Sequence, residues 1–242
     1  FPTPAPQSPA PEPTFSPAAI SQIEDIVAQK LRELVPPTPT PVVKNQPALL
    51  SKPEAVKLAS PAVVKIGAGD DKGGSGTLIS EDGRILTNHH VIEGHRSVTV
   101  LVRDQYTMSG YVLGSNKDLD LAIVQISGGP WPYLKIAEYI PEVGEDILSI
   151  GYALNLVGPA TVTSGIVSQV RAGKNFTWIQ TDTPINPGNS GGAVVNLKGE
   201  FFAIPAIKRQ EAQDVSFLIA LFSVADDIKR LQEKAEPQGH SP

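Results

Sequence analysis

The chain has 242 residues, 40% of them apolar, a formal net charge of -5 at pH 7 and no cysteine. It is long enough for one full core with appendages and too short for a second large domain beside it. The negative charge and the lack of any Lys/Arg-rich run argue against nucleic acid as a partner. The missing cysteines exclude disulfides, thiol catalysis and cysteine metal sites.

No apolar run approaches the roughly 18 residues that a membrane span requires. The chain starts at Phe1, and its only methionine is Met108. We therefore expect a segment upstream of this sequence, such as a signal or a membrane anchor.

Residues 1–52 form a Pro-rich arm. Its two proline-dense stretches, 1–17 and 36–47, are expected to be extended spacers. Between them, apolar residues recur at three- and four-residue steps, which predicts a helix over 18–35. Its apolar residues at heptad spacing could form an interface for self-association. The alternatives are a helix that docks on its own domain and a helix that frays. The spaced residues are Ile20, Val27 and Leu34.

From about Pro53 onward the chain consists of short β-rich runs separated by Gly, Asn and Asp turns, among them VVKIGAG, SVTVLV, LAIVQI and GAVVNL. Many strands at short spacing predict a barrel or a sandwich. No interval is long or periodic enough for the crossover helix of a parallel α/β fold. A Gly- and Pro-rich cluster near 130–142 predicts a connection between two halves, and a capping-box pattern starts a final helix over 223–236 before a tail over 237–242.

The segment Pro187–Asn196, PGNSGGAVVN, sets a serine among glycines before an apolar run. Glycines let backbone amides approach a ligand closely. If Ser190 is a nucleophile, the amides of Gly188 and Ser190 are the natural donors to the oxyanion of a tetrahedral intermediate. A Gly-rich hairpin without a catalytic role is the alternative at this point.

Two further segments carry candidate partners for that serine. In ILTNHHVI, His89 and His90 follow a β-rich approach, and on a strand the two would face opposite sides. In DLDLAIVQI, Asp118 and Asp120 compete as the carboxylate at the mouth of an apolar strand. The residues alone leave both choices open.

The order of these motifs along the chain, His then Asp then Ser, is that of chymotrypsin-type peptidases. Gly188–Gly192 also fits the G-x-S-x-G pattern of α/β-hydrolases. That interpretation fails because Pro184 and Pro187 precede the serine where a strand is needed, and a strand-like run follows where a helix is needed. The only histidine after the serine is His240, in a polar tail.

Five segments resemble the HtrA-type trypsin-like serine peptidases: GSGTLIS, ILTNHHV, DLAIVQI, TVTSGIVS and QTDTPINPGNSGGAVVN. The resemblance implies an all-β fold of two six-stranded antiparallel barrels over 53–230, with barrel 1 at about 53–128 and barrel 2 at about 133–222, followed by the C-terminal helix. We expect a protease domain without the PDZ domain that usually follows it in this family.

Matched residue by residue, the resemblance implies a serine endopeptidase with His90 as general base, Asp120 as its orienting carboxylate and Ser190 as nucleophile. No metal or cofactor is implied. By the same analogy, the substrate pocket has no acidic residue and favours small to medium apolar side chains. Its four positions are Pro184, Ile204, Pro205 and Ala206.

The resemblance also implies an unfolded or misfolded polypeptide as substrate, bound in extended form, with a trimeric assembly and an extracytoplasmic location. The alternative function is a chaperone-like or peptide-binding scaffold with low turnover.

Overall fold

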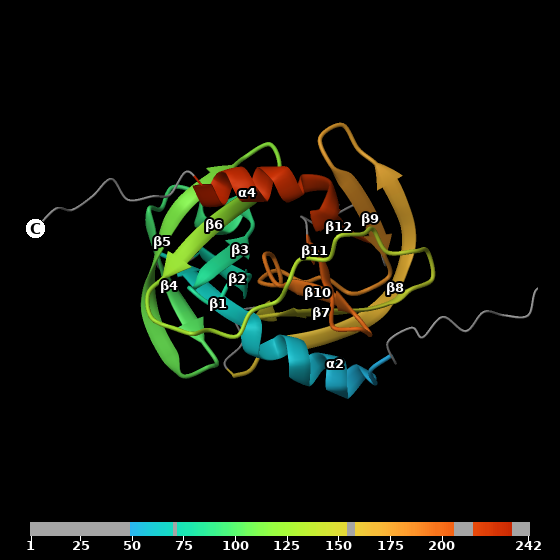
Figure 1. The fold of residues 1–242 in the computed structure, drawn as a ribbon, viewed down its shortest axis with the longest axis horizontal. Coiled ribbons are helices and arrows are strands. Elements are labelled where there is room, and N and C mark those ends of the chain that lie inside the picture. The colour runs from blue at the N-terminus through green and yellow to red at the C-terminus, as the bar shows by residue number, and fades with distance from the viewer. Residues whose placement is uncertain (1–48, 70–71, 154–157, 206–214, 234–242) are drawn as a thin grey trace, which may run out of the picture. The chain divides into compact units, whose positions relative to one another are not determined.

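The computed structural model describes residues 49–69, 72–153, 158–205 and 215–233. The predicted arm helix over 18–35 and the predicted tail over 237–242 lie outside these residues. The described strands form two closed antiparallel barrels of six strands each (Figure 1), which confirms the predicted fold class.

Barrel 1 has the spatial strand order β1-β2-β3-β6-β5-β4. In its first strand, Val64, Ile66 and Ala68 are buried, while Lys65 and Gly67 between them are partly exposed. This alternation is the two-residue period of a strand with one face in the core. The strands are β1 (Val63–Ala68), β2 (Lys72–Leu78), β3 (Arg84–Thr87), β4 (Ser97–Val102), β5 (Tyr106–Asn116) and β6 (Leu121–Ile126).

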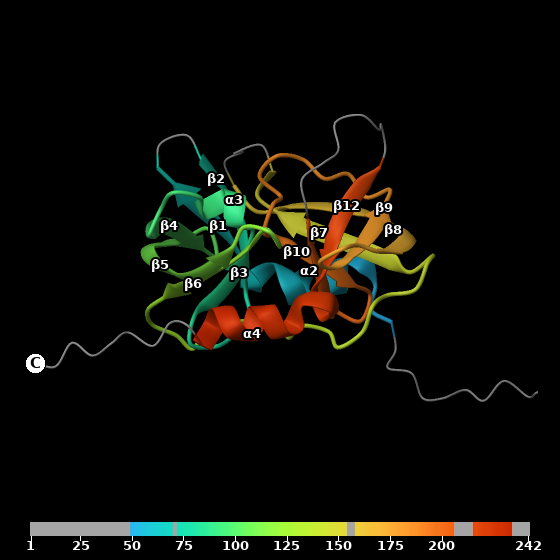
Figure 2. The same ribbon diagram turned by 90° about the horizontal axis from the view of Figure 1, so that it is seen from above.

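Barrel 2 lies beside barrel 1 (Figure 2) and has the order β10-β11-β12-β9-β8-β7. Ile150 and Phe201 of barrel 2 belong to the same buried apolar cluster as Val64 and Ile66 of barrel 1. The two barrels therefore share a continuous core. The strands are β7 (Asp146–Gly151), β8 (Thr161–Ala172), β9 (Thr177–Thr181), β10 (Ala193–Asn196), β11 (Phe201–Pro205) and β12 (Ser216–Ala220).

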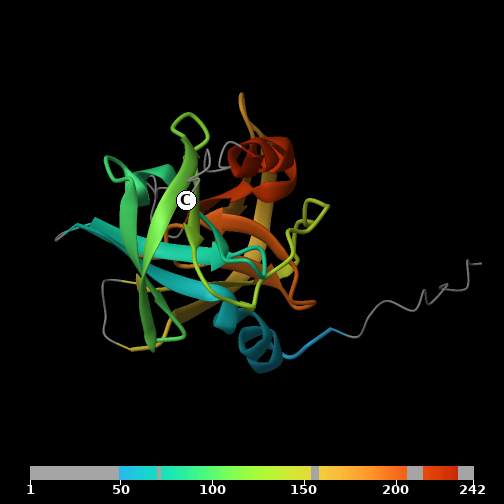
Figure 3. The ribbon, with the colours of Figure 1, turned by 60° about the vertical axis from the view of Figure 1, so that its left-hand side comes forward.

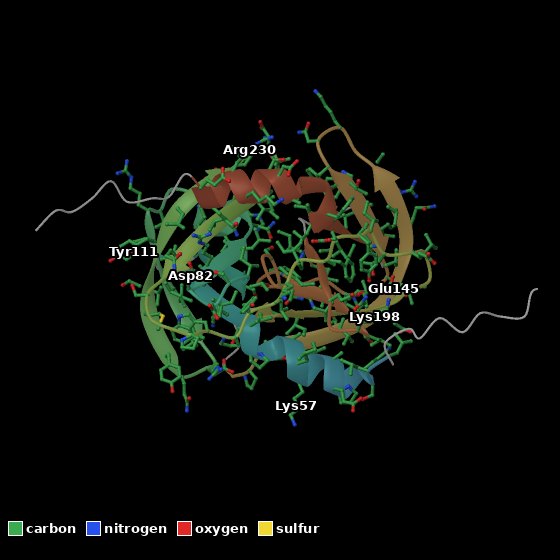
Figure 4. The ribbon with its side chains drawn as sticks, viewed as in Figure 1. Lys57, Asp82, Tyr111, Glu145, Lys198 and Arg230 are labelled. Carbon is green, nitrogen blue, oxygen red and sulfur yellow. The ribbon has the colours of Figure 1, made fainter. Side chains whose placement is uncertain are left out.

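Helix α2 (Lys52–Ala59) precedes the first strand, in a region where the sequence predicts only β-rich runs from about Pro53 onward. A capping box begins this helix, because the Ser51 amide donates to the Glu54 carboxylate at 2.8 Å. Its buried face carries Ala55 and Ala59, while Lys57 points away from the barrels (Figure 4).

Helix α4 (Ala225–Glu233) lies on the opposite side of the barrels from α2 (Figure 3). A short 3-10 helix over Leu221–Val224 leads into it, so the helix predicted over 223–236 starts two residues later, and residues 234–236 lie outside the described part. Ile228 and Leu231 are buried, and Arg230 points outward (Figure 4). Because α4 follows β12 of barrel 2 and packs on β5 and β6 of barrel 1, it straps the barrels together.

None of the helices in the described part of the chain is both long enough and apolar enough to cross a membrane.

Candidate active site

His90 lies in α3 (His89–Ile92), a four-residue helix that follows β3 and Asn88. The expectation that the two histidines sit on a strand is therefore wrong. Their side chains nevertheless separate, because His89 Nε2 lies 3.7 Å from Glu93 Oε1, one turn further along the chain. Of the two imidazoles, only that of His90 contacts Asp120.

Asp120 ends the turn between β5 and β6, in left-handed backbone with φ 52°. Aspartate tolerates this conformation better than most residues. The turn is built by Asn116 Oδ1, which accepts from the amides of Asp118 and Leu119 at 3.0 and 3.2 Å. From α3's side, Asn88 Nδ2 donates to the Asp120 carbonyl oxygen at 2.9 Å. Asp118, the competing carboxylate, is exposed.

The His90 ring and the Asp120 carboxylate form a hydrogen-bonded pair. His90 Nδ1 lies 2.8 Å from Oδ2 and 3.0 Å from Oδ1, and the His90 amide donates to Oδ1 at 3.0 Å. Their side chains are 32% and 24% exposed. An ionised carboxylate only accepts, so this geometry suits the imidazole tautomer with its proton on Nδ1, which leaves Nε2 as the proton acceptor.

Ser190 belongs to a loop of barrel 2 between β9 and β10, and this loop is held against β2 of barrel 1. The Ser75 amide of β2 donates to the Ser190 carbonyl oxygen at 2.8 Å. A Cβ at Gly74 would lie 2.8 Å from Val91 Cγ2 and 3.1 Å from that same carbonyl oxygen. The serine loop and the helix that carries His90 thus meet at Gly74. Within the described residues, no hydrogen bond joins the Ser190 hydroxyl to His90.

Two amides in this loop have no acceptor among the described residues. Gly188 adopts φ 94°, and the Asn189 amide donates to the Asn186 carbonyl oxygen at 3.0 Å, which closes a turn. The amides of Gly188 and Ser190 donate to nothing among the described residues, so both are free to bind a ligand oxygen.

Three of the four positions predicted for the substrate pocket lie in the described part of the chain. Pro184 is exposed, and Ile204 and Pro205 are buried at the end of β11, with Ile204 in the core cluster. Ala206 lies outside the described residues. None of the three described positions lines the cavity of about 490 Å³ that lies beside His90 and Asp120.

Barrel 2 closes that cavity with Phe176, Trp178 and Ile219. The two aromatic rings pack at 4.5 Å between centroids. Sequence reasoning missed this wall, although the run FTWIQTD carries two aromatic residues within three positions.

The rim of the cavity carries charges of both signs, from Glu93 and Asp118 and from Lys117 and Lys174. The Lys117 ammonium, 3.4 Å from Glu93, holds the pKa of that carboxyl below its usual range. No single charge therefore dominates the entrance. In the described part of the chain, no group of three or more His, Asp or Glu side chains could hold a metal ion.

Comparison with known proteins places this geometry in a family. The trypsin-like peptidase domain matches residues 74–204, more than half of the chain. The chain belongs to the trypsin-like peptidase family. This confirms the predicted membership. The HtrA type is supported by the structure of the HtrA-type protease AlgW with a tripeptide, whose sequence is 30% identical to this chain. The two structures match with a TM-score of 0.68 over 76% of this chain and 65% of that one.

Other relatives agree. The serine endoprotease from Yersinia pestis has a structure 33% identical, with a TM-score of 0.69, over 77% of this chain and 68% of that one. The putative serine protease HhoB of Synechocystis sp. (strain ATCC 27184 / PCC 6803 / Kazusa) is 35% identical over 67% of this chain and 41% of its own length. The serine endoprotease DegS of Escherichia coli (strain K12) is 35% identical over 66% of this chain and 50% of its own length. The chain thus spans half or less of these two curated relatives.

Gly191, directly after Ser190, occupies the tightest point of this trypsin-like site. Its backbone has φ 80°, and a Cβ there would overlap the Ser75 carbonyl oxygen and the Thr87 hydroxyl. Thr77 Oγ1 also donates to the Gly191 carbonyl oxygen at 3.3 Å. Position 191 therefore requires glycine for its conformation and for the space.

We expect Gly191→Ala to destabilise the fold more than a glycine substitution at positive φ in open space. Gly144 is the matched control, because it has φ 92° and a Cβ added there would meet nothing within 4 Å. Gly144→Ala should cost about 1 to 2 kcal/mol from the left-handed backbone alone. Gly191→Ala should cost roughly 1 to 3 kcal/mol more, from the overlap. Urea unfolding of both variants measures the difference, and equal losses would show that the loop can move away from β2.

Proposed function

We propose that this chain is a serine endopeptidase that hydrolyses unfolded or misfolded polypeptides. The observation that carries the proposal is the His90–Asp120 pair of barrel 1, beside which the Ser190 loop of barrel 2 is anchored at Ser75. Membership of the trypsin-like peptidase family supports the same reaction.

In the proposed reaction, Ser190 Oγ attacks a peptide carbonyl while His90 Nε2 accepts its proton and later gives it to the leaving amine. Asp120 keeps the other proton on Nδ1 and stabilises the imidazolium that forms. The free amides of Gly188 and Ser190 would bind the oxyanion of the tetrahedral intermediate. Water, activated by His90, then hydrolyses the acyl-enzyme.

The Ser190 hydroxyl has no hydrogen bond to His90 here, and such bonds in free enzymes are often long and tighten only in the complex. A peptide-binding scaffold with low turnover would not need Asp120 in left-handed backbone with its carboxylate bound to the amide and to Nδ1 of His90. Backbone in sparsely populated regions is found in turns and clusters at functional sites, and here it accompanies a carboxylate bound to a histidine. The arrangement therefore favours catalysis over binding alone.

By analogy with relatives named as periplasmic endoproteases, we also propose an extracytoplasmic location for this chain.

An extended substrate would lie along a strand edge of the cleft, where backbone hydrogen bonds give affinity.

The triad assignment predicts that Ser190→Ala lowers kcat about a millionfold, because only binding and oxyanion stabilisation remain. The purified chain should also react with a fluorophosphonate probe, and the variant should not. Retained proteolysis by a folded Ser190→Ala variant would refute the assignment of the nucleophile.

A second pair of variants tests which of the two aspartates orients His90. Asp120→Asn should lower kcat about ten-thousandfold, because the imidazole is then held in the wrong tautomer. Asp118→Asn, two residues away and exposed, should leave kcat nearly unchanged. If Asp118→Asn has the larger effect, the orienting carboxylate has been misassigned.

For the residue before the cleaved bond, we propose a preference for small to medium apolar side chains, with Pro184, Ile204, Pro205 and Ala206 forming the pocket. None of the four is acidic, and a buried Lys or Arg side chain would need a carboxylate to offset its desolvation. Cleavage of a peptide library, read by mass spectrometry, tests this. A preference for Lys or Arg would overturn the pocket assignment.

We further propose a trimer, with the predicted helix over 18–35 reinforcing the assembly through its heptad-spaced residues. Light scattering should then give the full chain a larger assembly than a chain that begins at Leu49. Equal numbers of subunits in both would show that the arm does not assemble the protein.

A further inference from the structure

The side chain of Ser75 lies at the point where β2, β7 and the Ser190 loop meet, and it is completely buried. Its Oγ donates to the Gly188 carbonyl oxygen at 2.7 Å and accepts from the Tyr152 amide at 2.8 Å. Its own amide donates to the Ser190 carbonyl oxygen at 2.8 Å. One residue of barrel 1 therefore holds the carbonyl groups of both residues whose amides face the proposed oxyanion.

The hydroxyl of Ser75 matters more for Gly188 than a single hydrogen bond usually would. Gly188 has no side chain to pack, and its φ of 94° lies in a region that only glycine adopts freely. The peptide that joins it to Asn189 is tied at both ends, by Ser75 Oγ at the carbonyl and by the Asn186 carbonyl oxygen at the amide. Without the hydroxyl, the carbonyl end is free.

No other side chain in the described part of the chain hydrogen-bonds to residues 188–190. The side chain of Asn189 is fully buried, yet neither of its polar atoms has a partner among the described residues. Asn189 therefore adds no hydrogen bond that could replace the one from Ser75.

We propose that Ser75 is a positioning residue that fixes the Gly188 amide where the oxyanion forms. This inference rests on the proposed peptidase function. Because oxyanion donors act mainly in the transition state, loss of the hydroxyl lowers kcat and leaves KM nearly unchanged. A residue that served only the stability of the barrels would change the unfolding midpoint without this separation of kcat from KM.

The test compares Ser75→Ala with Ser149→Ala in the full chain. Ser149 is the matched control, because it is also fully buried, on β7, and its hydroxyl has no partner among the described residues. For Ser75→Ala, kcat on a peptide substrate should fall about tenfold to a hundredfold, less than the hundredfold to thousandfold lost with a whole oxyanion donor. Ser149→Ala should keep the kcat of the unchanged chain. Equal kcat values for the two folded variants, or a change confined to KM, would overturn the inference.

A second variant covers the case in which Ser75→Ala does not fold. Ser75→Cys keeps the shape of the side chain but places a larger atom and a much weaker hydrogen-bonding group there, so its kcat should also fall while KM stays. A folded Ser75→Cys variant with the kcat of the unchanged chain would contradict the inference.

Hydrogen exchange read by mass spectrometry gives a result that does not depend on catalysis. The amides of Asn189 and Gly192 are bonded within the loop, so the segment 186–192 should exchange faster in Ser75→Ala and not in Ser149→Ala. If the unchanged chain neither cleaves peptides nor reacts with a fluorophosphonate, the proposed function fails, whereas unchanged exchange and kcat in Ser75→Ala refute the role of Ser75 alone.

Discussion

The site depends on one close backbone contact between the barrels, the hydrogen bond from the Ser75 amide of β2 to the carbonyl oxygen of Ser190. Beside this bond the two main chains come so close that two neighbouring positions have no room for a side chain. Gly74 on one side and Gly191 on the other are the positions where a Cβ would collide. The glycines in β2 and in the serine loop therefore have the same cause, because each leaves space for the close contact between the two barrels.

A contact of this kind is useful only if the barrels keep their relative position. The shared core provides that rigidity, because Ile150 and Phe201 of barrel 2 pack in the same buried cluster as Val64 and Ile66 of barrel 1. Close-packed interiors transmit displacement with little loss. Helix α4, which leaves barrel 2 and buries Ile228 and Leu231 near barrel 1, adds a second tie on the outside.

The strand series could be predicted because β-branched runs between turn residues are a local property of the sequence. Helix α2 was missed although Ser51 and Glu54 form a capping box, since eight residues give little periodicity. The histidine segment was predicted as a strand because β3 runs directly into it. In the structure His89–Ile92 form a helical turn, and His90 contacts Asp120, which is 30 residues away in the chain and could not be read from the local sequence. Which side chains line the cavity beside His90 depends on tertiary packing, so its wall of Phe176, Trp178 and Ile219 could not be predicted from the sequence.

Two adjacent residues at the end of β3 hold the two parts of the proposed site, the orienting carboxylate and the oxyanion donors. Thr87 Oγ1 donates to the Ser75 carbonyl oxygen at 2.7 Å, and the Ser75 hydroxyl in turn holds Gly188. Asn88, the next residue, donates to the Asp120 carbonyl oxygen at 2.9 Å. Because these anchors are consecutive in the chain, the end of β3 is hydrogen-bonded both to Ser75, which holds Gly188, and to the backbone of Asp120. These local hydrogen bonds therefore add to the packing of the barrels in fixing the position of the orienting carboxylate relative to the proposed oxyanion donors.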